Sequence, residues 1–203
     1  MAKYLANQLI LEYAAVTTVA LGVTLPQAII TVGDTSHFPS TGSITIGAST
    51  ITYTGKTATT FTGATGGTGA IVVGDRVVSG TYQAMTAYAN DVAVEQSLDE
   101  VDVTTYGTLD KLYMAGLRDG TFSFRVMYDD GSWASTPQGL LHNILNKSVA
   151  WRIRVLGLGT GKPETTFDGF ITSLNETFAN DSSAVGAEIS VRNSTPVTRT
   201  TQA

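Results

Sequence analysis

Apolar and polar residues alternate along much of the second half of the chain, which is the pattern of β-strands with one buried face. Between residues 121 and 128, Phe122, Phe124 and Val126 fall on one side, whereas Ser123 and Arg125 fall on the other. The same period of two recurs in residues 91–103, 149–156, 165–174 and 185–192. These stretches predict antiparallel sheet packed on one side.

One segment has the helical period instead. Leu140, Leu141, Ile144 and Leu145 form an apolar stripe at helical spacing. Pro137 is suited to the first turn of a helix. The pattern therefore predicts a single flanking α-helix over about residues 136–147.

The composition changes sharply between residues 26 and 81. This segment holds 14 of the 32 threonines in the chain, only four charged residues and no leucine. Short apolar runs alternate there with turn residues, as in Ile44 to Ile46 and Ile51 to Tyr53. We interpret residues 26–81 as a Thr/Gly-rich inserted β-meander, and residues 1–25 and 82–203 as the main β-sandwich or half-barrel domain.

Charge and rare residues exclude several functions. The 203-residue chain has a formal charge of −5, so it lacks the basic surface typical of proteins that bind nucleic acid. It contains no cysteine and only two histidines, His37 and His142, which excludes thiolate sites and a multi-histidine metal site within one chain. The apolar stretch from Leu9 to Leu25 is interrupted by polar residues, so we expect no membrane span and no signal peptide.

Candidate catalytic motifs are weak. Residues 156–163 resemble a phosphate-binding loop, but Leu156 and Pro163 occupy positions where that motif requires glycine and a hydroxyl residue. Asp129 to Gly131 reads as a hairpin turn, and the acidic run from Asp99 to Asp102 reads as a solvated strand end. We therefore expect no enzyme activity, no cofactor and no metal.

A more informative phrase lies near the middle of the chain. Residues 100–107 (EVDVTTYG) followed by residues 111–122 (KLYMAGLRDGTF) resemble a run found in the tail tube, or major tail, proteins of long-tailed, siphovirus-like bacteriophages. The phrase FITSL at residues 170–174 and the ending from Val185 onward are also similar to the last two strands of that family. The resemblance covers residues 1–25 and 82–203, and the insertion departs from it.

The resemblance implies a structural virion protein. Subunits of this family form hexameric rings that stack into a tube, with the inner sheets joined around a channel for genome delivery. The implied partners are further copies of the chain, the tape measure protein and DNA transiently inside the channel, and the tail terminator and baseplate or distal tail proteins. The implied location is the phage tail, assembled in the host cytoplasm, with no membrane partner.

Two sets of residues are candidates for these roles. We read residues 104–120 as a long connection that contacts other subunits or rings, with a loop folded onto its own core as the alternative. The apolar contact candidates are Tyr106, Leu109, Leu112, Tyr113, Met114 and Leu117. The candidates for an acidic, hydroxyl-rich channel lining that repels DNA phosphates are Glu164, Asp168, Glu188, Thr166, Thr172 and Ser190.

A second function stays open at this point. A non-enzymatic β-sandwich binding module, such as a carbohydrate-binding fibre protein or a capsid-decoration protein, would expose aromatic side chains on a platform. Trp133, Tyr53 and Tyr82 are the candidates for such a platform.

Overall fold

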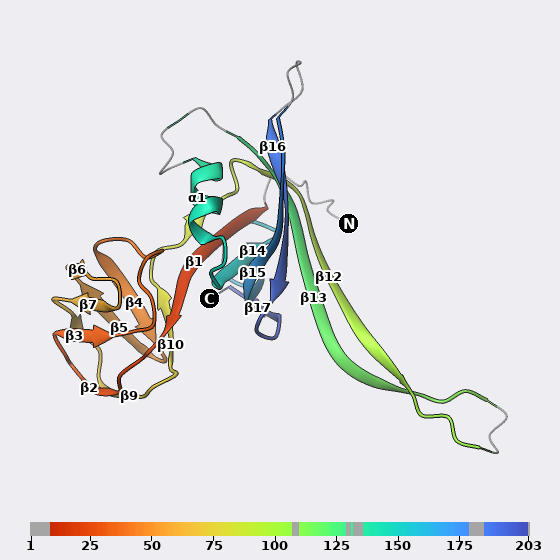
Figure 1. Ribbon diagram of the computed structural model, residues 1–203, viewed down its shortest axis with the longest axis horizontal. Coiled ribbons are helices and arrows are strands. Elements are labelled where there is room, and N and C mark those ends of the chain that lie inside the picture. The colour runs from red at the N-terminus through yellow and green to blue at the C-terminus, as the bar shows by residue number, and fades with distance from the viewer. Residues whose placement is uncertain (1–8, 107–109, 129–130, 132–135, 179–184, 203) are drawn as a thin grey trace.

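The protein is described by a computed structural model covering residues 9–106, 110–128, 131, 136–178 and 185–202. Its fold is mainly β and antiparallel with one short helix, α1 (Pro137–Ile144), which confirms the predicted fold class. Figure 1 shows three parts: a central body, a rounded lobe on one side and a long two-stranded extension on the other. The described residues contain no helix long and apolar enough to cross a membrane.

The body is built from long strands. They are β1 (Ile10–Thr18), β11 (Gln83–Ala84), β12 (Ala89–Asp102), β13 (Tyr113–Met127), β14 (Val149–Arg154), β15 (Pro163–Thr177), β16 (Gly186–Asn193) and β17 (Thr198–Thr201). They follow the order β12-β13-β16-β15-β14-β1, with β11 beside β1 and β17 beside β15. The alternation in the sequence therefore predicted the strands of this sheet closely.

The core of the body lies on one face of this sheet, under α1. Trp151 sits at its centre, with ring centroids 5.5 Å from both Phe122 and Phe124. Its indole Nε1 donates a hydrogen bond to the Gly169 carbonyl at 3.3 Å. Without this bond the buried N–H group would have no hydrogen-bond partner. Leu141 of α1 is fully buried against the same cluster, so the helix covers the apolar face.

The lobe, which we call the module, comprises residues 19–79. Its strands are β2 (Val23–Leu25), β3 (Ile29–Thr31), β4 (Gly42–Ile46), β5 (Ser49–Tyr53), β6 (Gly55–Lys56), β7 (Thr60–Thr62), β8 (Thr65–Gly66), β9 (Gly69–Ile71) and β10 (Arg76–Ser79). It has its own core, in which the Phe61 ring lies 5.1 Å from that of Phe38 and 4.6 Å from that of Tyr53. This core also takes in Ala15, ahead of residue 26.

Strand β1 runs through both parts. Its residues Ile10–Ala15 pair with β14 of the body, whereas Val16–Thr18 pair with β10 of the module. One continuous strand thus belongs to both sheets. The module is attached by backbone hydrogen bonds of a shared strand rather than by a flexible linker.

Two side-chain ion pairs brace the same junction. Lys147, just after α1, pairs with Asp34 of the module. Arg76 of β10 donates hydrogen bonds to both carboxylate oxygens of Asp168 of β15. Because these pairs join residues far apart in the sequence, they fix the module relative to the body.

Candidate functional site

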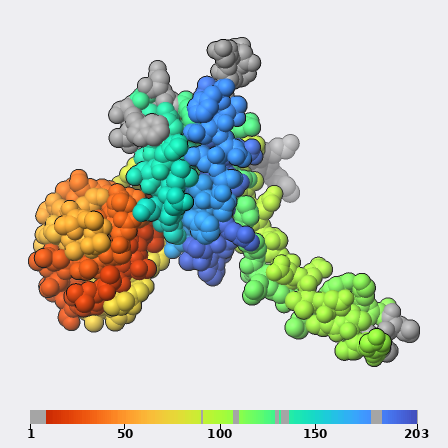
Figure 2. Space-filling model, viewed as in Figure 1, coloured from red at the N-terminus to blue at the C-terminus, as the bar shows by residue number. Residues whose placement is uncertain are grey.

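The two-stranded extension is the main candidate. Strands β12 and β13 pair with each other over their full length, but β13 pairs with β16 only from Thr121 to Met127. Residues 95–120, which we call the arm, therefore leave the sheet as a ribbon. Figure 2 shows the arm reaching away from the rest of the molecule.

The arm corrects the expectation for residues 104–120. Tyr113 to Gly120 belong to β13 and pair with β12, so this part is strand and not connecting loop. The alternative, a loop folded onto its own core, is also wrong for the described residues. The contact candidates Tyr106, Leu112, Tyr113, Met114 and Leu117 are all at least 50% exposed, and Leu109 lies outside the described residues.

Apolar side chains are concentrated on the arm. Among the described residues, eight of the seventeen large hydrophobic side chains that stand exposed lie between Leu98 and Leu117. Leu98, Val101 and Val103 belong to this set, and sequence reasoning had not named them as contacts. The alternation of Val101, Asp102 and Val103 was a signal available in the sequence for two of them. An exposed apolar patch of this kind marks an interaction surface.

The register sorts these side chains onto two faces, because directly opposed residues of a ladder point to the same side. Val101 opposes Met114. The Val103 amide donates to the Leu112 carbonyl at 2.9 Å, which places the next apolar pair on that face. Glu100 and Asp102 oppose Ala115 and Tyr113 on the other face. The arm thus has an apolar face and an acidic face near its end.

The proposed lining residues lie on β15 and β16. Glu188 and Ser190 alternate with the buried Ile189 and Val191, so they lie on the sheet face opposite the core. Thr172 lies at a register shift in β15 and donates its hydroxyl to the Ser190 carbonyl at 3.1 Å. These three residues share one polar region of the sheet.

Asp168 requires a correction. Its side chain is 7% exposed and is held by Arg76, which is 49% exposed. Because Asp168 is paired and buried, its carboxylate is not available to repel DNA. The sequence had placed Asp168 on the polar face of its strand. The alternation of β15 could not reveal the pairing, because the covering arginine comes from the inserted module.

The Glu164 carboxylate is also paired with an arginine. Its carboxylate accepts a hydrogen bond from Arg154 Nε at 2.7 Å, and Arg152 pairs with Glu12 at 2.7 Å on the same face. Thr166 opposes Arg152 across the β14–β15 ladder. This face therefore carries paired charges of both signs and hydroxyl groups rather than the acidic surface that the sequence predicted.

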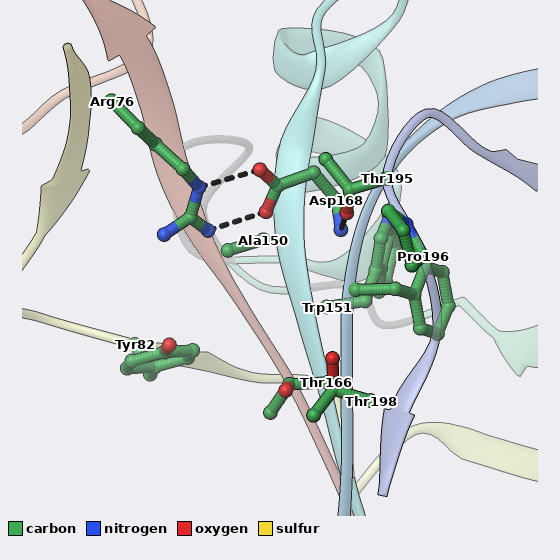
Figure 3. Close-up of a pocket in the computed structure, with 10 residues that line it drawn as sticks. Arg76, Tyr82, Ala150, Trp151, Thr166, Asp168, Thr195, Pro196 and Thr198 are labelled. Atoms are coloured by element: carbon green, nitrogen blue, oxygen red, sulfur yellow. Dashed lines mark hydrogen bonds and ion pairs between the residues drawn. The ribbon is translucent and has the colours of Figure 1, made fainter.

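A cleft of about 400 Å³ opens where the module meets the body. Figure 3 shows the Arg76–Asp168 pair on one wall and Thr166, Thr198 and Tyr82 on the others. Among the described residues, no group of three His, Cys, Asp or Glu side chains could hold a metal ion. The cleft contains an ion pair that serves the junction.

Two of the three residues expected to carry an aromatic platform, Tyr53 and Tyr82, do not present open rings. Tyr53 is buried in the module, where its hydroxyl donates to the Pro39 carbonyl at 3.0 Å. The Arg152 guanidinium covers the Tyr82 ring, with its Cζ 3.4 Å from the ring centroid. Trp133 lies outside the described residues.

Comparisons with known proteins give distant structural likenesses. No family model matches the chain, and no curated protein matches it. A chain from the virion of a native gene transfer agent particle is 13% identical over 59% of this chain and 88% of that chain, with a TM-score of 0.46. A chain from the C6-symmetric tail of an empty gene transfer agent particle is also 13% identical, over 60% of this chain and 87% of that one, with a TM-score of 0.47. These likenesses are too weak to establish function.

Proposed function

We propose that this chain is a structural subunit of a bacteriophage-type tail, and that copies of it assemble into stacked hexameric rings forming the tail tube. The observation that carries this proposal is the arm. A two-stranded ribbon alone in water is marginally stable, and this one displays most of its large apolar side chains to solvent. Contact with other copies would bury those side chains and remove the exposed sheet edges.

The other parts of the molecule have roles consistent with this assembly. We assign the polar face carrying Glu188, Ser190 and Thr172 to the channel, where it would face the tape measure protein and then DNA. Its paired charges and hydroxyl groups offer no unbroken basic surface to hold phosphates. We assign the module, an inserted subdomain, to the outside of the tube, because a lobe of that size inside would narrow the channel.

The remaining assignments follow from the tube. The ends of the tube would meet the tail terminator and the baseplate or distal tail proteins. The protein would be made in the host cytoplasm and found in the virion, in a siphovirus-like tail that conducts the genome. No catalytic role is assigned.

Negative-stain microscopy of the purified full chain tests the proposal. Rings or tubes with sixfold symmetry are expected at high protein concentration. A matched variant removes residues 98–118 and joins Ser97 to Asp119 through Asn-Gly, because these two residues oppose each other in the ladder and that turn closes hairpins. The shortened variant should fold and remain monomeric. A full chain that stays monomeric at every concentration would contradict the proposal.

A further inference from the structure

The arm is acidic as well as apolar. Residues 95–120 contain six acidic and two basic residues, a formal charge of −4, whereas the whole chain carries −5. Four of these acids, Glu95, Asp99, Glu100 and Asp102, lie on β12. Among the described strands β12 pairs only with β13, so it forms the outer edge of the arm. A partner surface for this edge needs positive charge.

A surface with the complementary character lies on the body, just beyond Val197, which lies close to Gly120 at the root of the arm. We call it the C-terminal edge: strand β17 together with the hairpin of residues 155–162. Lys162 and Arg199 have no carboxylate partner among the described residues, since Glu164 beside them is already paired with Arg154. The Lys162 ammonium donates to the Leu156 carbonyl at 2.9 Å, which fixes it on this hairpin.

The C-terminal edge also offers apolar contacts and an open strand. Val155 is 50% exposed and Leu158 is 64% exposed. Among the described strands, β17 pairs only with β15, so its other side presents unpaired backbone groups. Open strand edges accept a further strand through main-chain hydrogen bonds. Charge, apolar surface and backbone therefore all match the acidic strand of the arm.

From this complementarity we propose that the C-terminal edge of one copy receives the arm of a second copy, with β12 of the arm lying toward β17. The inference rests on the proposed assembly and names the receiving surface within it. Glu100 and its acidic neighbours lie against Arg199 and Lys162, and the apolar side chains of the arm cover Val155 and Leu158. The contact is heterologous, because two different surfaces of the chain meet, so it continues from copy to copy.

A charge-swap experiment on the full chain tests this contact. The variants Glu100→Lys and Arg199→Glu each place like charges at the contact, and the double variant restores opposite charges. Sedimentation measures the protein concentration needed for assembly. Each single change should raise this concentration by about fivefold in low salt. That factor corresponds to the largest stabilisation measured for one exposed ion pair. The double variant should return it toward the wild-type value, and high salt should shrink all differences.

The controls separate the two levels of the proposal. Arg125→Glu makes the same change of charge on another strand and should not be rescued by Glu100→Lys. The neutral changes Glu100→Gln and Arg199→Gln should give smaller effects of the same sign, with folding checked by circular dichroism. If wild-type protein assembles but the single charge reversals assemble equally well, or the double variant shows no rescue, the receiving surface is overturned while the proposed function stands. If wild-type protein never assembles, both are overturned.

Discussion

Arg76 and Asp168 join the two cores of the chain: the arginine lies on β10 of the module and the aspartate on β15 of the body. The guanidinium meets both carboxylate oxygens, a geometry that only arginine provides among the basic side chains. Since Asp168 is the more deeply buried partner, the arginine compensates a charge that water cannot reach. The junction therefore depends on this residue more than on an ordinary surface arginine.

Arg76→Ala should destabilise the folded chain because it leaves the Asp168 carboxylate buried without a counterion. We expect a loss of about 2–3 kcal/mol, below the range for a fully buried pair because Arg76 is half-exposed. Urea unfolding measures it. The control Arg125→Ala, an exposed arginine, should change the free energy of unfolding by about 0.5 kcal/mol at most. Equal losses in the two variants would argue against a bracing role for the pair.

The stability of the protein should decrease as the pH falls from about 7 to about 5, because of His37. Burial lowers the pKa of His37, whose side chain is 2% exposed and whose Nε2 donates to the Val16 carbonyl at 2.9 Å. The unfolded chain, with a histidine pKa of about 6.5, then binds more protons than the folded chain at acidic pH. The stability that neutral His37 contributes is therefore present above about pH 6.5 and is lost as the pH falls below that value.

Urea unfolding at several pH values measures this effect. His37→Gln should flatten the decrease between about pH 7 and pH 5, while His142→Gln should keep it, because His37 remains in place. At lower pH a second decrease is expected from Asp34. Burial opposes ionisation of Asp34, but hydrogen bonds from Lys147 and Ser36 outweigh it and hold its pKa below the ordinary value. An unchanged profile in His37→Gln would assign the first decrease to another group.

Changes at the end of the arm should separate assembly from folding. The double variant Leu112→Ser and Met114→Ser removes apolar side chains that are already exposed, so the free energy of unfolding of the monomer should change by about 0.5 kcal/mol at most. Assembly should need at least about tenfold more protein, because burying such side chains stabilises a contact by about 1.5–3 kcal/mol each. Sedimentation and urea unfolding measure the two effects.

The contrasting variant is Leu141→Ser in α1, where the side chain is fully buried. It should cost about 2–5 kcal/mol in folding. If the arm variant instead unfolded as readily as the helix variant, the arm side chains would be part of the monomer core.

Two glycines of the module offer a matched comparison of backbone strain and crowding. Gly47 and Gly63 have φ values of +57° and +60°, so alanine is strained at both by about 1 kcal/mol. An added Cβ at Gly47 meets nothing within 4 Å, whereas at Gly63 it would lie 2.1 Å from the Thr54 hydroxyl. Gly63→Ala should therefore lower the stability by about 1–3 kcal/mol more than Gly47→Ala. Thermal unfolding distinguishes them, and equal melting temperatures would show that Thr54 moves aside freely.

The sequence pattern predicted the strands well because each is half-buried. Residues 121–128 alternate and indeed bury Phe122, Phe124 and Val126. The predicted helix was longer than α1, since Leu145 leaves the helical conformation although it completes the apolar stripe. The apolar stripe therefore indicates which residues are buried, not where the helix ends. Leu145 packs against the core without being helical.

The candidate site was predicted less well, for reasons that lie in tertiary structure. Tyr113 to Gly120 were read as part of a long connection, yet they pair with β12. The ion pair of Asp168 could not be foreseen from β15, because Arg76 lies 92 residues away. The described apolar candidates of the arm are exposed, and their role as contacts between copies stays a prediction.

The shared strand β1 has a consequence for the order in which the protein forms during synthesis. Residues 15–79 supply the whole core of the module, whereas Ile10 must await Arg154 before it can pair in the body. A ribosome therefore releases a complete module long before β14, and domains generally fold as they emerge. The module would then hold one end of β1 ready while the rest of the body is made. The sheet that bears the arm closes last, so in a nascent chain the base of the arm is held in its sheet only after β16 has been made.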